Sequence, residues 1–319
     1  MGRKGLLVYS VHAATLSLLL SACTTLPLTD TYPVATPDHV EPYCAFYIAA
    51  HPDDIELFMG RNAWSDIVGH QAKTVFVVLS AADGGRGTEI GGTGKPYFRA
   101  REEGHERAIR FWASLDGQPV PDTKMMDVAI SGKILHRQSV AGRIVIYNLR
   151  LPDGGLSGTG YPSTGYQSLS LLRSGKIAEM HSIASDLSLT YTELKELIRG
   201  IVKYEAHQFP TVWVHIQDEN LRVNPFDHPD HTATASTVAD AIADPSFHCV
   251  SVARYTTYVN AEKSPNLSSS DLQIHVGTWG ALNSALVDDG QANTWDSHHN
   301  VWLGKEYFST RQQRSHCNF

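Results

Sequence analysis

The chain has 319 residues, 42% of them hydrophobic, so it can bury the core of a sizeable domain without being divided into several. Its formal net charge is -7 at pH 7, with 26 Lys and Arg residues against 33 Asp and Glu. This balance leaves no basic stripe for a phosphate backbone, and we therefore expect no nucleic-acid partner. A neutral or sugar-like ligand agrees better with the charge.

The N-terminus has the composition of a secretion signal. Two basic residues precede a mostly apolar stretch over residues 6–20, which is shorter than the ~20 residues of a membrane span. The stretch ends in Leu-Ser-Ala-Cys23, which resembles the lipobox of bacterial lipoproteins. We expect residues 1–22 to be removed as a signal peptide and Cys23 to be lipidated. The alternative is an ordinary cleavage site beside an unrelated cysteine.

Residues 23–42 are rich in Thr and Pro, which predicts a tether between the lipid and a single domain over residues 43–319. The lipobox resemblance implies export, with the lipid anchoring the protein in the membrane of the bacterial cell envelope. Thr24, rather than Asp, follows the cysteine, and this implies the periplasmic side of an outer membrane where the source has one.

Three further cysteines, Cys44, Cys249 and Cys317, would then lie in an oxidising compartment. An odd number allows one disulfide and leaves one thiol. The sequence does not decide which two pair.

Alternating strand and helix patterns begin after the tether. Residues 45–50 form a short apolar run typical of a strand covered on both faces. Residues 56–68 have a helical pattern, and residues 74–80 are again rich in β-formers. Such a βαβ unit predicts parallel pairing with a right-handed crossover.

The glycine-rich segment 83–96 is too flexible for regular structure, and we expect a mobile active-site loop there. A charged, amphipathic helix is predicted over 98–115 and a strand over 143–149. A long connection rich in Gly and Ser follows over 152–175. In it, Tyr161 and Tyr166 are placed to stack on a ring.

A further helix is predicted over 191–205, led by a capping pattern at Thr192, Glu193 and Glu196. Residues 211–216 predict a strand and 231–243 a helix. The alternation predicts a three-layer αβα, Rossmann-like fold with a mostly parallel central sheet and a site beyond the strands' carboxyl ends.

The C-terminal part is harder to interpret. From residue 250 the pattern is β-like and then rich in loops. His298 and His299 lie in this polar tail, and we expect them to be solvated rather than to bind a metal.

A run of chemically active residues, His51-Pro52-Asp53-Asp54, follows the first predicted strand. Its tight turn can offer His51 and Asp54 to a metal and leave Asp53 free. A catalytic zinc takes three ligands of the His and Asp/Glu type and lowers the pKa of its water to about 7. A nearby carboxylate then accepts the water's proton. The alternative is a helix N-terminus capped by the two carboxylates.

A second run, His228-Pro229-Asp230-His231, follows the strand at 211–216 and opens a helix. In a chain with 16 His, this spacing alone is a weak signal. Because carboxyl ends of parallel strands share one edge of a sheet, both runs are expected at one site.

These residues resemble the signatures of the PIG-L/LmbE zinc-dependent N-deacetylases, which include relatives of the GlcNAc-PI de-N-acetylase. The family has an HPDD turn after the first strand and a later HPDH. Two supporting matches are Arg101-Glu102-Glu103-Gly104 and the segment 149–154, so the resemblance spans about residues 45–260. It implies an LmbE-like fold and one zinc ion per chain.

The resemblance also implies a role for each matched residue, as follows: His51, Asp54 and His231 bind zinc; Asp53 is the general base; His228 is the electrophilic or acid partner; Asp230 orients a histidine; Arg101 and Asp153 bind sugar hydroxyls. For Arg101 and Asp153 the alternatives are a surface helix charge and a turn carboxylate.

One residue departs from the family pattern. Relatives often have Tyr two residues before the HPDH motif, where it assists at the oxyanion, whereas this chain has Phe226. Phe cannot donate that hydrogen bond. Either His228 and zinc suffice, or Asn224 or a loop residue takes its place.

The expected reaction is zinc-dependent removal of an N-acetyl or N-acyl group from an amino sugar or glycoconjugate of the N-acetylglucosamine type, outside the cytoplasm. Two alternatives remain open. One is a zinc hydrolase of a different amide bond, and the other is a sugar-binding lipoprotein with a relic site. A nucleotide-binding protein would need a glycine-rich turn where HPDD stands.

Overall fold

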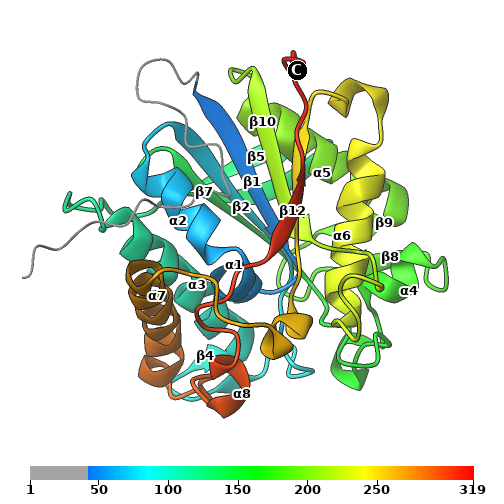
Figure 1. Cartoon of the computed structure of the whole chain (residues 1–319). Helices are drawn as coiled ribbons and strands as arrows, with labels where there is room; N and C mark the ends of the chain where they lie inside the picture. Colours follow the sequence, from blue (N-terminus) through cyan, green and yellow to red (C-terminus); the bar gives the residue numbers. More distant parts are fainter. Residues whose placement is uncertain (1–41) are drawn as a thin grey trace, which may run out of the picture. The chain divides into compact units, whose positions relative to one another are not determined.

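A mostly parallel sheet of eight strands lies at the centre of the part of the chain that the computed structural model describes, residues 42–319 (Figure 1). The five inner strands are parallel, and an antiparallel strand or hairpin flanks them at each edge. The expected signal peptide, the tether and Cys23 lie outside the described residues. Within residues 42–319, no helix combines the length and the apolar character needed to cross a membrane.

The strands of the sheet, from one edge to the other, are β12 (Phe308–Arg311), β11 (Ser251–Tyr255), β10 (Thr211–Gln217), β1 (Tyr43–Ala49), β2 (Ala72–Ser80), β7 (Ile144–Leu151), β6 (Lys133–Val140) and β5 (Lys124–Ile130). Two short hairpins lie outside it: β3 (Ile90–Gly91) with β4 (Lys95–Pro96), and β8 (Glu179–His181) with β9 (Ser188–Thr190).

Helices cover both faces of the sheet, as Figure 1 shows. One face packs against α1 (Asp54–Phe58), α2 (Gly60–Val68), α3 (Tyr97–Ala113) and α7 (Ser269–Asp288). The other packs against α5 (Tyr191–Ala206) and α6 (Pro229–Ile242). The short helices are η1 (Pro162–Thr164), α4 (Leu169–Arg173), η2 (Pro245–Phe247), η3 (Tyr258–Glu262) and α8 (Ser297–Asn300).

The central strand β1 explains why two layers of helices are needed. Successive side chains of a strand point to opposite faces. Cys44, Phe46 and Ile48 accordingly join the core under α5 and α6, while Ala45 and Tyr47 join the core on the other face. Because β1 is apolar on both faces, each face needs a cover. The predicted three-layer fold with a mostly parallel sheet is confirmed.

Two helix starts differ from the prediction. The helix expected over 56–68 is two helices, since the backbone leaves the helical region at Met59, where φ is -131° and ψ is 4°. The cap of α5 is Thr190 rather than Thr192: the Thr190 hydroxyl accepts a hydrogen bond from the Glu193 backbone N–H, and the Glu193 carboxylate accepts one from the Thr190 N–H.

The largest difference from the prediction lies in the C-terminal part, which was expected to be rich in loops but contains the 20-residue helix α7. The buried face of this helix includes polar residues such as Asp271, His275 and Asn283, so its hydrophobic periodicity is weak. Helix α7 packs closely on α3: a Cβ added to Gly104 would lie 2.7 Å from the backbone oxygen of Leu282. The β5–β6 hairpin was not predicted either.

Of the three cysteines in question, Cys249 and Cys317 form a disulfide across a sequence separation of 68 residues. Cys44 is the remaining thiol and is buried in β1. One pair and one free thiol agree with the expected count, and the disulfide ties the C-terminal end to the segment after α6.

Candidate metal centre

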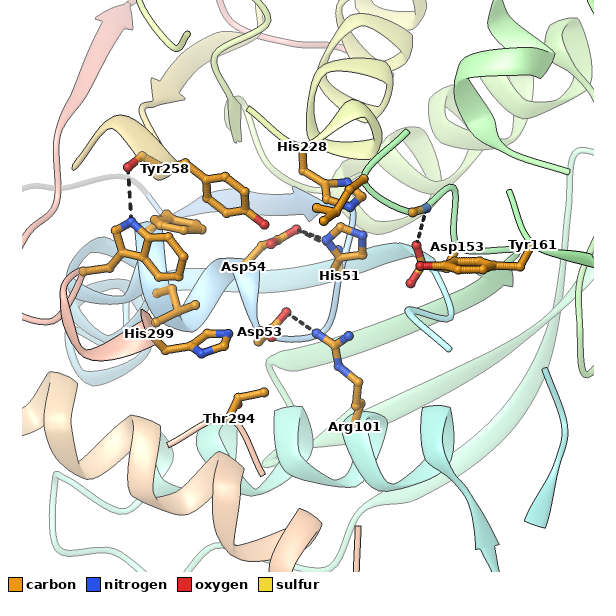
Figure 2. Close-up of a pocket in the computed structure, with 15 residues that line it drawn as sticks. His51, Asp53, Asp54, Arg101, Asp153, Tyr161, His228, Tyr258, Thr294 and His299 are labelled. Atoms are coloured by element: carbon orange, nitrogen blue, oxygen red, sulfur yellow. Dashed lines mark hydrogen bonds and ion pairs between the residues drawn. The ribbon is translucent and has the colours of Figure 1, made fainter. Parts of the chain in front are cut away.

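The two histidine motifs meet beyond β1 and β10, where the order of the strands in the sheet reverses. Strand β1 pairs with β2 on one side and with β10 on the other, and all three are parallel. The next strands along the chain, β2 and β7, lie on one side of β1, whereas β10 and β11 lie on the other. Open α/β sheets bind their ligands at such a switch point. The turn after β1 carries His51, Asp53 and Asp54, and the connection after β10 leads to His228, the N-cap of α6. Figure 2 shows the resulting cluster.

Three ligand-type side chains converge there. His51 Nδ1 lies 3.2 Å from His231 Nε2 and 3.4 Å from Asp54 Oδ2, and His231 Nε2 lies 2.9 Å from Asp54 Oδ1. Ligand atoms about 2.1 Å from a tetrahedral zinc ion would be about 3.4 Å apart. The side chains of the predicted ligands are therefore spaced as zinc requires, and they are buried.

Carboxylates and an amide fix the orientation of these groups. Asp227 Oδ1 accepts a hydrogen bond from His231 Nδ1 at 2.7 Å, which leaves His231 Nε2 as the lone-pair donor towards the cluster. Asp230 Oδ2 lies 3.5 Å from His51 Nε2, in agreement with the orienting role predicted for Asp230. Gln217 donates a hydrogen bond to Asp54 Oδ2 at 2.9 Å.

The electrostatics of the cluster suit a cation. Burial alone would raise the pKa of the Asp54 carboxyl, but His231 and His51 hold it well below its usual range. Burial likewise disfavours a charged His231, yet Asp54 and Asp227 raise its pKa to about 10. The carboxylates thus stabilise a positive charge at this point, and a divalent ion can replace the proton there.

His228 differs from the other two histidines. Burial, together with the neighbouring His51 and His231, lowers its pKa to about 4. Its Nδ1 accepts a hydrogen bond from the backbone N–H of Asp230 at 3.1 Å. The proton of the neutral ring must therefore be on Nε2, which makes His228 a hydrogen-bond donor on that side.

Asp53 lies beside the ligand cluster, with an oxygen within 4.8 Å of ligand atoms of His51 and Asp54. Its Oδ1 forms an ion pair of 2.5 Å with Arg101 Nη2, and Arg101 Nη1 also donates to the backbone oxygen of Ala82. Arg101 is not a surface charge, because its side chain is 14% exposed and pairs with the Asp53 carboxylate at the cavity wall (Figure 2). Its role in sugar binding stays a prediction.

Asp153 lies at the cavity and also organises its loops. Its two carboxylate oxygens accept hydrogen bonds from the backbone N–H groups of Gly155, at 2.7 Å, and Gly84, at 3.1 Å. This joins the glycine-rich segment to the connection after β7. Asp153 is therefore both a turn carboxylate and a residue of the cavity wall.

A cavity of about 240 Å³ opens above the cluster. Its polar side contains Asp53, Asp54, Arg101 and Asp153 together with His51, His228 and His299. Aromatic side chains provide other parts of the wall: Phe58, Tyr161, Tyr258 and Trp302. Tyr161 is therefore placed as predicted, whereas Tyr166 does not line the cavity and is 58% exposed.

Of the alternatives for the family tyrosine, Asn224 has its side chain engaged outside the cavity. Its side-chain oxygen accepts from Thr257, and its amide nitrogen donates to Asp227. Phe226 points outward and is 96% exposed. The aromatic hydroxyl that faces the cluster belongs to Tyr258 in η3, and Figure 2 shows it directed towards Asp54 and His51.

Three residues of this site were missed in the sequence. Asp227 could have been found from its spacing of four residues before His231, since such residues are neighbours at the start of a helix. Tyr258 belongs to no motif, and its one signal is that it follows the end of the parallel strand β11 by three residues. His299, expected to be solvated, lines the cavity instead, because the chain after α7 returns to the edge of the sheet where the motifs lie.

Comparison with known proteins gives distant structural likenesses. No protein-family model matches the chain, and no curated protein sequence matches it. The N,N'-diacetylchitobiose deacetylase from Pyrococcus horikoshii, solved with its inhibitor MPG, has 15% sequence identity and a TM-score of 0.46, with 84% of this chain and 83% of that chain covered. The zinc-inhibited form of teicoplanin deacetylase Orf2 has 12% identity and a TM-score of 0.44, with 81% and 89% covered.

A protein of different activity is also similar. GalB, the 4-carboxy-2-hydroxymuconate hydratase from Pseudomonas putida KT2440, has 12% identity and a TM-score of 0.36, with 82% of this chain and 81% of that chain covered. At these identities and TM-scores, activity is not transferred from these proteins to the chain, and it must follow from the site.

Proposed function

We propose that the chain is a zinc-dependent hydrolase that removes an N-acetyl or other N-acyl group from an amino sugar of the N-acetylglucosamine type. One observation carries this proposal. The ligand atoms of His51, Asp54 and His231 converge at distances of 2.9–3.4 Å beside a further carboxylate, Asp53, which is paired with Arg101. A hydrolytic zinc site needs this combination of three ligands and one separate base.

A zinc ion bound by these three residues would polarise the amide carbonyl and lower the pKa of a water molecule to about 7. Asp53 takes one proton from the attacking water as the water oxygen bonds to the carbonyl carbon. The Arg101 ion pair keeps the Asp53 carboxylate in place for this transfer. When the carbon–nitrogen bond breaks, the proton passes to the nitrogen, and acetate and a free amine are released.

Two donors serve the oxygen that becomes negative during attack. The first is His228 Nε2–H, since Nδ1 accepts from the Asp230 backbone. This favours hydrogen-bond donation over the general-acid role considered for His228. The second is the Tyr258 hydroxyl, whose pKa is raised by burial and by Asp54 and Asp53, so that it remains protonated. Preorganised donors of this kind stabilise an oxyanion.

Replacing Tyr258 with Phe should therefore lower kcat by about 10- to 100-fold while KM and zinc content stay near the wild-type values. The ring would still stack on Trp302, whose centroid is 5.0 Å away, so the change removes the donor and keeps the packing. Steady-state kinetics with zinc analysis measure this effect. Tyr166→Phe, at an exposed position outside the cavity, is the matched control. A Tyr258→Phe enzyme with wild-type kcat would remove the hydroxyl from the mechanism.

The substrate class is tested by acetate release from a panel of N-acetylated sugars, oligosaccharides and simple amides, each with a chelator control. Release from amino sugars and not from simple amides supports the proposal. Release from simple amides alone would assign a different amide hydrolase. Tight sugar binding without any release, unchanged by chelation, would instead indicate a binding protein.

We also propose that the protein acts outside the cytoplasm, anchored to the cell envelope by a lipid on Cys23. The lipobox resemblance at Cys23 and the Cys249–Cys317 disulfide support this, because disulfides persist in oxidising compartments. Mass spectrometry of the protein purified from membranes should show a diacylated N-terminal Cys23. Cys23→Ala should release the protein from the membrane fraction, and a variant that stays there without lipid would contradict the anchor.

A further inference from the structure

The C-terminal part of the chain contributes a histidine to the cavity that the proposed mechanism does not use. His299 lies in α8, whose N-cap is Asp296. Asp296 Oδ1 accepts two hydrogen bonds from it, one from the His299 backbone N–H at 2.9 Å and one from Nδ1 at 2.8 Å. Backbone and ring are therefore both fixed by one carboxylate.

This contact decides what the other ring nitrogen can do. A carboxylate only accepts hydrogen bonds, so His299 Nδ1 carries a proton. In the neutral ring, Nε2 is then an acceptor. The His299 side chain is 20% exposed and lines the cavity, and Figure 2 shows the ring directed towards Asp53.

Aromatic neighbours hold the ring in this position. His299 stacks on Trp279, with centroids 5.6 Å apart and an interplanar angle of 26°, and it meets Trp302 edge to face at 5.6 Å. Trp279 is fully buried in α7. A ring packed in this way presents Nε2 in a defined direction, as a specific binding site requires.

The charges of the cavity indicate which group Nε2 meets. Among the described residues that line the cavity, Arg101 is the single Arg or Lys, and Asp53 neutralises it. No free cation of these types is thus available there for an anionic substituent. Trp302 and Tyr258, which stack on each other, make this part of the cavity wall apolar. On an uncharged amino sugar the donors for such an acceptor are the hydroxyl groups and the N–H of the amide that is cleaved, and the hydroxyl groups are the more numerous.

We propose that His299, positioned by Asp296, accepts a hydrogen bond through Nε2 from a hydroxyl group of an uncharged amino-sugar substrate, and so determines which sugars the cavity accepts. This inference rests on the proposed function, because it deepens the description of the same site. His299 is a substrate-binding residue in this account, and Asp296 is a positioning residue.

The experiment compares His299→Ala with the wild-type enzyme on the disaccharide of N-acetylglucosamine and on its single-deoxy analogues. His299→Ala should lower kcat/KM on the parent sugar by about 10- to 100-fold, mainly through KM, and should keep its zinc. On one deoxy analogue the wild type should lose a similar factor, whereas His299→Ala should show no further loss. His299→Gln, which retains an acceptor, should recover part of the activity.

The adjacent histidine is the matched control, because His298 is exposed and does not line the cavity. His298→Ala should stay within about twofold of the wild type, as expected for an exposed side chain. If the wild type is active but His299→Ala is within threefold of it on every sugar, the His299 inference is overturned and the proposed function stands. The inference is also overturned if His299→Ala lowers kcat/KM by the same factor on every deoxy analogue as on the parent sugar. No acetate release by the wild type overturns both.

Discussion

Asp53→Asn should leave zinc bound and lower acetate release by about 10²- to 10⁴-fold. Asn has nearly the shape of Asp but cannot take a proton from water. The substitution leaves the three ligand side chains intact, because Asp53 pairs with Arg101 and not with the ligand cluster. Single-turnover acetate release with parallel zinc analysis measures the two effects separately.

Asp53→Asn removes both the proposed base and the ion pair with Arg101, so a second variant has to separate the two effects. Arg101→Gln removes the partner of the 2.5 Å contact but leaves the Asp53 carboxylate in the cavity. We expect a smaller loss than for Asp53→Asn, since a base that is less well positioned still accepts protons. An Asp53→Asn enzyme that retains more than a tenth of wild-type turnover would assign the base to another residue.

His231→Ala should abolish stoichiometric zinc binding and, with it, activity. The substitution removes one of three ligands and leaves Asp227 without the ring that it orients at 2.7 Å. Asp227→Asn should be milder and weaken zinc affinity by about 10- to 100-fold, because outer carboxylates tune the ligand rather than replace it. Zinc content after dialysis against a weak chelator measures both. His207→Ala serves as the surface-histidine control, because His207 is exposed at the C-cap of α5 and belongs to neither motif.

A different result would relocate the metal. His51, Asp153, His228 and Asp230 also bring ligand atoms to within 4.8 Å of one another. If His231→Ala keeps one zinc per chain while Asp230→Asn loses it, the ion is held by that second group. The assignment of His231 as a ligand would then be wrong.

The sheet and the two motifs could be predicted because their signals are local. The apolar runs of β1 and β10 indicate buried strands, and both motifs stand directly beyond or shortly after a strand end. Since parallel strands align their carboxyl ends, the meeting of His51 with His231 follows from topology. Their spacing of 180 residues in sequence gave no other indication.

The remaining parts of the site depend on tertiary packing. The C-terminal wall of the cavity exists because α7 packs on α3, and the buried polar face of α7 hides that helix from hydrophobic periodicity. His299 reaches the cavity after α7, whereas Tyr258 follows β11 by three residues, and neither belongs to a motif. The Cys249–Cys317 disulfide could not be predicted either, because any two of the three cysteines could have formed the one pair that their number allows.

The most direct test of the central claim is a zinc titration of the metal-free protein on an N-acetylated amino sugar. We predict no acetate release without metal, and activity that rises linearly with added zinc and reaches its plateau at one equivalent per chain, in step with the appearance of free amine. Acetate release that persists in the metal-free protein, or a fully loaded protein that releases none from any N-acetylated sugar, would contradict the account.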